Sequence, residues 1–320
     1  MKLSRIFSLC LAASLLTGAP AAAADAGKDI TVIVMALNSD YWHMVEAGAK
    51  LAGQDLGYNV NVIGPNAETD AIGQANMVED AAANKVAAIV LAPNDPVALI
   101  PAVGNAKAAG VPVVVIDMAL TTQDESLYES FIGTDNYEAG GMAAGYLIKK
   151  LPSGCEVAII RGIVGSSNHD GRCNGASDAF KAAGVKVVSI QPADSERGKA
   201  VTVAENVLQT NPGIKAIYCT NDEMALGAYQ AVANIQKQKD ILVMGFDGSF
   251  GALDSIEAGE LTASLAQMPI DMGYSGVKAA VDFLAGKKLE KRIKSATVIV
   301  DKANLAKFKA DIKEKLSKAN

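Results

Sequence analysis

Short, nearly continuous apolar runs rich in β-branched residues recur along this chain, and segments with helical spacing separate them. Eight of the runs span residues 30–36, 58–64, 86–93, 111–117, 155–162, 185–190, 214–221 and 241–247. Continuous apolarity is typical of strands that are buried on both faces of a sheet. Strands that alternate with helices at this spacing predict the α/β class, with parallel sheets and right-handed crossovers.

The connections between these elements support the same class. Two helical segments end on Gly110 and Gly184, and a strand follows each glycine at once, so the two look like one unit repeated in two halves. Glycine tolerates the left-handed backbone that closes a helix. Residues 118–137 lack a clear period, so we expect the chain to cross there from one domain to another.

The pattern changes after residue 247. It predicts a helix at 250–258, a strand at 261–267, a helix at 270–284 and a strand at 296–300. If the chain crosses only once, all of these elements belong to the second domain. If it crosses again, each domain is built from discontinuous segments. The periodicity of the sequence does not distinguish these two arrangements. In the tail, Leu305, Phe308, Ile312 and Leu316 have helical spacing, which predicts an amphipathic surface helix with solvated lysines.

The first 24 residues are typical of an export signal. Lys2 and Arg5 precede an apolar run at residues 6–16, and small residues lead up to Ala24, after which we expect cleavage. Lipidation at Cys10 is disfavoured because the apolar run continues past it. The mature chain exceeds the size at which a single core stops growing, which predicts two domains.

Charge and missing motifs exclude several function classes. Without the signal, 27 basic and 35 acidic residues remain, a formal charge of −8, which argues against a nucleic-acid partner. Phosphate-binding glycine loops, a nucleophile elbow and HExxH or CxxC motifs are absent from the sequence. The glycines of "GGMAAG" (140–145) have a helical context and predict close helix packing. We therefore expect no enzyme, no metal and no cofactor.

Three cysteines remain after processing: Cys155, Cys173 and Cys219. Their positions in the predicted sheet favour burial as small hydrophobic residues. A disulfide between Cys173 and Cys219 is the weaker alternative.

Polar and aromatic residues gather at the carboxyl ends of the predicted strands, where open parallel sheets bind ligands. They are Tyr41, Trp42, Asp117, Arg172, Asn221, Asp247 and Gln267. Carboxylates accept from paired hydroxyls, amides both donate and accept, arginine donates as a fork, and rings cover apolar C–H faces. This set predicts a site for a sugar or polyol.

Each of these residues also has a purely structural interpretation. Asn221 can cap the following helix, Asp222 and Glu223 can favour its dipole, and Tyr41 with Trp42 can pack onto the next helix. The convergence of the set on one sheet edge favours the ligand site. We expect Asn221 to bind ligand and its two acidic neighbours to serve the helix.

Four stretches closely resemble the periplasmic ribose- and allose-binding proteins of ATP-driven (ABC) sugar importers. They are "SIQPAD" (189–194), "NVLQTNPGIKAIYCTNDEMALGA" (206–228), "GFDG" (245–248) and "LTASLAQ" (261–267). The resemblance implies a type I periplasmic binding protein, with two Rossmann-like lobes that a three-strand hinge joins and closes on the sugar. It implies a first lobe of residues 25–133 plus 268–296, and a second lobe of residues 134–267 plus 297–320.

The resemblance also divides the site between the lobes. Tyr41, Trp42 and Asp117 would come from the first lobe. The second lobe and the hinge would supply Arg172, Asn221, Asp247 and Gln267.

Four positions depart from the family pattern. Ser39 stands where the family usually has Asn, and Met35 where it has Ser or Lys. Met118 replaces the Arg of ribose binders, and Ser195 replaces an aromatic residue after "QPAD". We therefore assign a small sugar or polyol without choosing one, retain Ser39 as a ligand residue, and expect His169 to supply a replacement contact.

The leading hypothesis is a monomeric periplasmic protein that delivers its ligand to an ABC permease, with a chemoreceptor as a further partner. One alternative is an exported sugar-active hydrolase that uses His169. Another is a sugar-responsive transcription regulator, which would need a basic helix-turn-helix where this chain has a signal sequence.

Overall fold

The structure is a computed structural model that describes residues 27–37 and 40–319. The predicted signal (1–24), Cys10 and Ser39 lie outside the described residues. None of the helices in the described part of the chain has the length and apolar character that crossing a bilayer requires.

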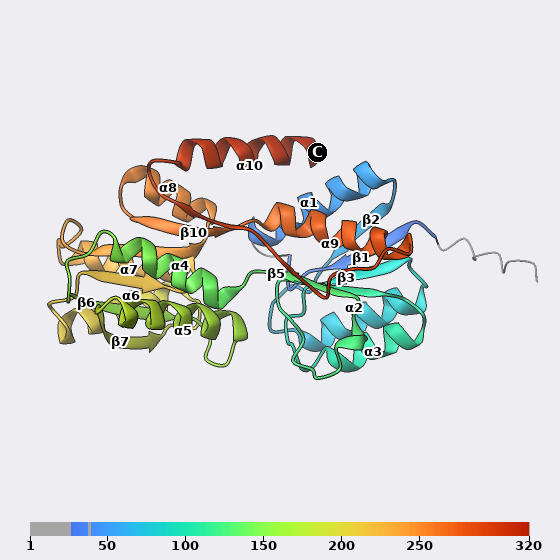
Figure 1. The fold of residues 1–320 in the computed structure, drawn as a ribbon, viewed down its shortest axis with the longest axis horizontal. Coiled ribbons are helices and arrows are strands. Elements are labelled where there is room, and N and C mark those ends of the chain that lie inside the picture. The colour runs from blue at the N-terminus through green and yellow to red at the C-terminus, as the bar shows by residue number, and fades with distance from the viewer. Residues whose placement is uncertain (1–26, 38–39, 320) are drawn as a thin grey trace, which may run out of the picture.

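Two six-stranded sheets form the two lobes (Figure 1). In sheet order, the first lobe contains β11 (Arg292–Lys294), β5 (Ser130–Gly133), β4 (Val113–Ile116), β3 (Ala88–Leu91), β1 (Asp29–Ile33) and β2 (Asn59–Ile63). The second contains β12 (Thr297–Val300), β10 (Ala263–Gln267), β9 (Leu242–Asp247), β8 (Ala216–Cys219), β6 (Glu156–Arg161) and β7 (Lys186–Pro192). The predicted α/β class is confirmed.

Helices cover both faces of each sheet, as the continuous apolar strands predicted. The helices that pack on the first sheet are α1 (Asp40–Leu56), α2 (Ala71–Ala83), α3 (Ile100–Ala108) and α9 (Pro269–Leu284). On the second are α4 (Asn136–Ile148), α5 (Ser167–Ala182), α6 (Arg197–Thr210), α7 (Asp222–Asn234) and α8 (Phe250–Ala258). Alternate residues of one strand enter different cores: Val32 packs on the α1 and α9 side, and Ile33 on the α2 and α3 side.

The chain passes between the two sheets three times. It leaves the first sheet after β5, returns to it after β10 through α9, and leaves again between β11 and β12. The first crossing lies within residues 118–137, where it was expected, although η1 (Glu125–Leu127), β5 and the start of α4, which the sequence did not indicate, lie there too. β11 was also missed, and β12 pairs antiparallel with β10 in a sheet that is otherwise parallel.

The two helix–glycine–strand segments at Gly110 and Gly184 have similar sequences, but their strands occupy different positions in the two sheets. Gly110 and Gly184 both adopt left-handed φ values, 80° and 71°, as predicted. However, the strand after Gly110 is β4, inside its sheet, whereas the strand after Gly184 is β7, at an edge. The similarity is therefore local and does not mark equivalent strands.

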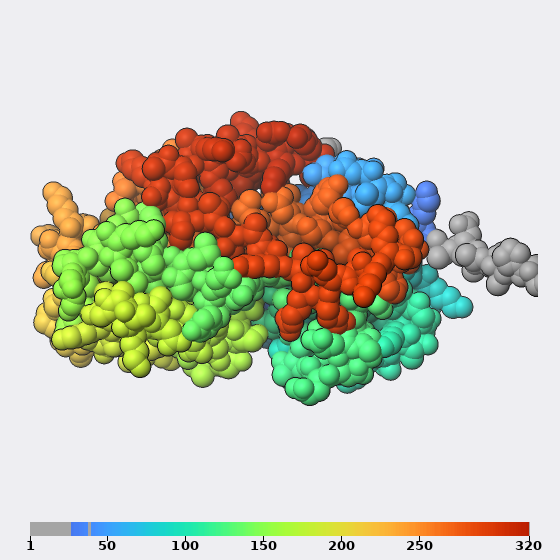
Figure 2. All heavy atoms as spheres, viewed as in Figure 1, coloured from blue at the N-terminus to red at the C-terminus, as the bar shows by residue number. Residues whose placement is uncertain are grey.

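The C-terminal helix α10 (Leu305–Ala319) extends across both lobes (Figures 1 and 2). Its apolar side is buried through Leu305, Phe308 and Ile312, which confirms the predicted amphipathic helix. The lysines are more than a solvated face. Lys309 pairs with α8 of the second lobe, and the Lys315 Nζ atom lies 2.5 Å from Asp271 Oδ1 on α9 of the first.

Close contact between α4 and α5 depends on glycine, as "GGMAAG" predicted. A Cβ atom on Gly140 would lie 2.2 Å from the carbonyl oxygen of Arg172, and one on Gly175 would lie 1.9 Å from that of Tyr137. Gly145, in the same helix, has open space around it. Backbone therefore packs on backbone at the turn of α5 that carries Arg172.

Gly140→Ala should destabilise the protein by roughly 1–3 kcal/mol, because the methyl group overpacks a backbone contact that has no flexible side chain to yield. Gly145→Ala is the matched control, and it should stabilise the fold by roughly 0.5–1 kcal/mol through helix propensity. Urea unfolding of both variants measures the two changes. Equal stabilities would show that α4 and α5 are not in tight contact.

Candidate functional site

Two carboxylates mark equivalent places in the two lobes. Asp117 follows β4, and Asp247 is the last residue of β9. Each of these strands is the third in its sheet, counted from β11 in the first lobe and from β12 in the second. Both residues have positive φ, 63° for Asp117 and 119° for Asp247. Such values are unfavourable for a residue with a side chain, and they concentrate at functional sites where the surrounding structure holds them.

A buried arginine organises the second-lobe side of the site. The Arg172 side chain is 5% exposed, and its Nη1 atom donates to Asp247 Oδ1 (3.2 Å) and to the carbonyl oxygen of Thr220 (2.9 Å). Its Nε atom donates to Asn136 Oδ1 at 2.8 Å. The guanidinium also lies over the Phe246 ring, 3.8 Å from its centroid. Partners from three segments therefore hold the guanidinium group in one orientation.

The hinge contributes to the same network through β10. Gln267 Nε2 donates to Asp247 Oδ1 at 2.8 Å, and Gln267 Oε1 accepts from the hydroxyl of Thr134 at 2.7 Å. Thr134 and Gln267 lie beside two of the three crossings between lobes. Asp247 is thus held by the second lobe and by the hinge.

The first-lobe side is built around Asp117 and the start of α1. The Tyr41 hydroxyl donates to Asp117 Oδ1 at 2.8 Å, and the Tyr41 and Trp42 rings meet edge to face with centroids 4.9 Å apart. Trp42 is only 3% exposed and belongs to the first-lobe core, and its Nε1 atom donates to Glu68 Oε1 at 2.9 Å. Trp42 is therefore a core residue of the first lobe.

Asn221 has the capping role that the sequence left open. Its Oδ1 atom accepts from the backbone N–H of Met224 at 2.9 Å, which leaves the Nδ2 group as its remaining donor. Asp222 is buried, and it accepts from the backbone N–H of Ser249 and the hydroxyl of Ser264, both at 2.7 Å. Asp222 therefore ties α7 to the β9–α8 turn, and Glu223 pairs with Arg197 on the surface.

His169 lies between two hydroxyl groups. Its Nδ1 atom is 2.8 Å from Thr220 Oγ1, and its Nε2 atom is 3.0 Å from Ser195 Oγ. Burial, with Arg172 and Arg161 nearby, lowers the pKa of His169 to about 3, so the ring is neutral and a weak base. A Ser–His pair oriented by a threonine, without a carboxylate, does not match the triad that the hydrolase hypothesis needs.

Burial raises the pKa values of the carboxyl groups of Asp117, Asp222 and Asp247. For Asp117, the hydrogen bond from Tyr41 and the charge of Arg172 oppose that effect. For Asp247, Arg172 and Gln267 oppose it. One buried guanidinium thus stabilises the ionised form of carboxylates from both lobes.

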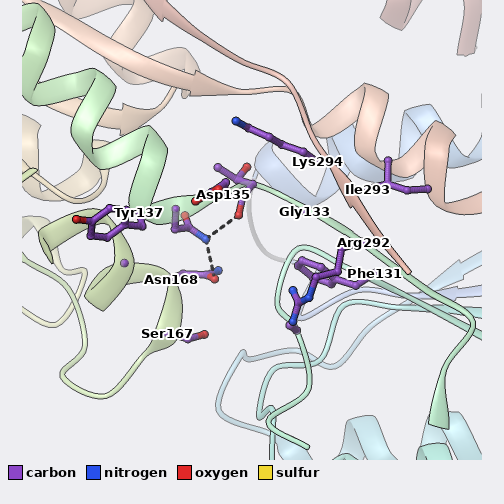
Figure 3. A pocket seen from close by; sticks show the side chains of 13 residues that line it. Phe131, Gly133, Asp135, Tyr137, Ser167, Asn168, Arg292, Ile293 and Lys294 are labelled. Carbon is purple, nitrogen blue, oxygen red and sulfur yellow. Dashed lines mark hydrogen bonds between the residues drawn. The ribbon is translucent and has the colours of Figure 1, made fainter. Parts of the chain in front are cut away.

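A cleft of about 450 Å³ opens between the lobes beside this network. Figure 2 shows a hollow between the green second-lobe and blue-green first-lobe atoms, and Figure 3 shows residues of both lobes around the cleft. None of the predicted site residues lines it. Asn136 and Asn168 do, and they also hydrogen-bond to Arg172 and Asp117. These two amides therefore separate the open cleft from the buried network.

The sequence pattern did not indicate several residues of the network, because they lie outside the predicted strand ends. They are Glu68, Gln74, Thr134, Asn136 and Asn168. Gln74 is fully buried, and its Nε2 atom donates to the carbonyl oxygens of Val34 and Ala92, both at 2.9 Å, which joins the ends of β1 and β3. Gln74, Asn136 and Asn168 are polar residues of helices, which is a signal that could have indicated them, whereas Glu68 and Thr134 lie outside the helices.

Cys155, Cys173 and Cys219 are free, so the weaker disulfide alternative is not formed; Cys173 and Cys219 are buried and Cys155 is half-buried. Within residues 27–37 and 40–319, no group of three or more His, Cys, Asp or Glu side chains is arranged to hold a metal ion.

Comparison with known proteins gives consistent matches over most of the chain. The family described as periplasmic binding protein domain matches residues 30–288. The D-allose-binding periplasmic protein of Escherichia coli is 40% identical over 263 residues, 80% of this chain and 85% of that protein. The ribose import binding protein of Bacillus subtilis is 37% identical, over 83% of this chain and 85% of that protein.

Solved structures match as well. An ABC transporter solute-binding protein from Agrobacterium vitis, with bound D-fucose, has a TM-score of 0.80 and 35% identity. The match covers 89% of this chain and 99% of that one.

His169→Gln should change how stability depends on pH. In the wild-type protein, the unfolded chain takes up a proton below the ordinary histidine pKa of 6.5, while the folded protein does not until about 3. Folding stability is therefore lost as the pH falls through this window, by up to about 1.4 kcal/mol per pH unit. The variant lacks this loss, so urea unfolding at pH 7 and pH 5 should show a smaller drop.

His43→Gln is the control, because His43 is exposed and pairs only with Glu46. It should leave the pH profile of the wild type nearly unchanged. Parallel profiles for the wild type and His169→Gln would mean that His169 is protonated in the folded protein.

Proposed function

The chain belongs to the periplasmic binding protein domain family, and from that premise we propose that it captures a small sugar or polyol between its lobes and delivers it to an ABC permease. Relatives in this family include proteins for allose, ribose and fucose. The family is one of solute-binding proteins, so the chain is a binding protein and not an enzyme.

The observation that carries the proposal is the meeting of carboxylates from both lobes around one buried arginine. Asp117 of the first lobe and Asp247 of the second are both near enough to Arg172 for its charge to oppose the rise in their pKa values that burial causes. Both carboxylates retain an oxygen, Oδ2, that no strong hydrogen bond occupies among the described residues. A ligand with two or more hydroxyl groups can donate to both.

The remaining residues supply the complementary groups. Arg172 donates, Gln267 joins Asp247 to the hinge, and Asn221 retains an Nδ2 donor after capping α7. Tyr41 and Trp42 form the aromatic side of the first lobe. We propose these five residues with Asp117 and Asp247, together with Ser39 and His169, as the ligand site. Ser39 rests on the sequence alone.

We propose a broader class of ligand than the sugar of any one relative. Met35 and Met118 place thioethers on the first-lobe side, where the sequence resemblance leads one to expect polar or charged groups. Ser195 lies 3.0 Å from His169 Nε2 and supplies a polar group where the sequence resemblance leads one to expect an aromatic residue. A pocket with fewer charges and this polar group suits a small polyol, a pentose or a deoxy sugar as well as a hexose.

Closure of the lobes is the expected mechanism of capture. Each lobe presents only part of the hydrogen-bonding set, so an open form can hold the ligand by one side at a time. Closing brings the second set into contact and removes water from the buried network, which strengthens each hydrogen bond. The three crossings are the segments about which the lobes would turn. We propose residues 25–133 plus 268–296 and 134–267 plus 297–320 as the two lobes, a division that the strand pairing supports.

Asp247→Ala and Arg172→Ala should each weaken ligand binding by about 1.5–3 kcal/mol or more, because each leaves a buried polar partner unpaired. Titration calorimetry with a panel of pentoses, hexoses, deoxy sugars and four- to six-carbon polyols measures the effect, and fluorescence of Trp42 reports closure. Glu223→Ala, on the surface of the same lobe, should bind as the wild type does. Wild-type affinity in both site variants would refute the assignment.

The location and the partners rest on the sequence. We propose cleavage after Ala24, a periplasmic monomer and, as a second partner beside the permease, a chemoreceptor. Native mass spectrometry of the protein released from the periplasm of expressing cells should give the mass of a single chain that begins at Asp25. A retained Met1, a lipid on Cys10 or a dimeric mass would each contradict one part of this proposal.

A further inference from the structure

We propose that Asn168 is a ligand-binding residue that joins the two lobes, by holding the same ligand hydroxyl as Asp117. This inference rests on the proposed function, since it concerns the same cleft. Asn168 lies in the first turn of α5, four residues before Arg172. The two side chains are therefore one turn apart on the same face of the helix.

Asn168 contacts the opposite lobe directly. Its Nδ2 atom lies 3.5 Å from Asp117 Oδ2, across the cleft between lobes. Its Oδ1 atom accepts from Asn136 Nδ2 at 3.0 Å, and Asn136 Oδ1 accepts in turn from Arg172 Nε at 2.8 Å. Figure 3 shows Asn168 at the start of α5, beside the cleft. A chain of amides thus links the arginine of one lobe to the carboxylate of the other.

The direct contact between Asn168 and Asp117 is long. A distance of 3.5 Å is the upper limit for a hydrogen bond, and charge-assisted bonds are normally near 2.8 Å. A hydroxyl group placed about 2.8 Å from both atoms can donate to Asp117 Oδ2 and accept from Asn168 Nδ2 at once. Both lobes then hold one ligand atom, and the weak direct contact becomes two strong ones.

The orientation of the amide is fixed by its other partner. Because Asn168 Oδ1 accepts from Asn136, the Nδ2 group is the one that faces Asp117. Tyr41 already occupies Asp117 Oδ1, so Oδ2 is the oxygen that remains for ligand. A donor from the second lobe and an acceptor from the first are therefore both aimed at one place.

Asn168 also borders the route by which a ligand can arrive. It is half-buried and lines the cleft of about 450 Å³, whereas Arg172 and Asp117 lie deeper. A ligand that enters by this cleft meets Asn168 before it reaches the arginine.

Asn168→Ala tests the proposal in the full mature chain. The probe is whichever member of a panel of D-ribose, D-allose, D-fucose, D-arabinose and erythritol binds the wild type most tightly. We expect its affinity to fall about tenfold, the loss of one good hydrogen bond, and mainly through faster dissociation. Ser167→Ala is the matched control: Ser167 lines the same cleft and is adjacent on the same helix, yet has no hydrogen bond to the network.

A second measurement separates ligand contact from a structural role. Deoxy forms of the bound sugar remove one hydroxyl at a time. For the hydroxyl that Asn168 holds, the loss of affinity on its removal should be smaller in Asn168→Ala than in the wild type, because only the bond to Asp117 remains to be lost, whereas other positions should give additive losses. Additive losses at every position would overturn the proposal.

The outcomes distinguish this inference from the proposed function. If Asp247→Ala weakens binding and Asn168→Ala does not, the inference fails and the proposed function stands. If no member of the panel binds the wild type, both fail. An unfolding midpoint for ligand-free Asn168→Ala equal to that of Ser167→Ala, with the affinity lost only in the former, is the result that supports a direct contact.

Discussion

The candidate site depends on the desolvated guanidinium of Arg172. A buried charge is costly unless it is paired and hydrogen-bonded, so the surroundings of Arg172 must be complete. Its partners come from the end of β8 (Thr220), the end of β9 (Asp247) and the segment after the first crossing (Asn136). One side chain therefore fixes the relative positions of two strand ends and the hinge.

That constraint extends to the packing beneath the site. Arg172 can reach its partners only if α5 lies close against α4, and the glycines at 140 and 175 allow their backbones to touch. The positive φ of Asp247 is held in place because its carboxylate accepts from Arg172 and from Gln267. Backbone strain at a strand end is thus balanced by the polar contacts that a ligand would use.

Much of the fold could be predicted, because the relevant signals are local. Strands buried on both faces need continuous apolar residues, so ten of the twelve strands were visible in the sequence. The two strands that were not predicted, β5 and β11, have only four and three residues. β5 is a strand because it pairs with β4, and β11 is a strand because it pairs with β5. The burial of Trp42 was not predicted for a similar reason, since it comes from α1 packing on the first sheet.

The sequence by itself determined the α/β class, the glycine positions at helix ends and helix contacts, and which strands end in a carboxylate. These depend on residues within a few positions of one another. Only the tertiary structure decided which polar groups meet: Asn168 with Asp117, Asn136 with Arg172, and Trp42 with Glu68, pairs that are 51, 36 and 26 residues apart. The physical reason is that a hydrogen bond requires two atoms within about 3 Å of each other, and here three crossings between lobes, which no local period encodes, bring those atoms together.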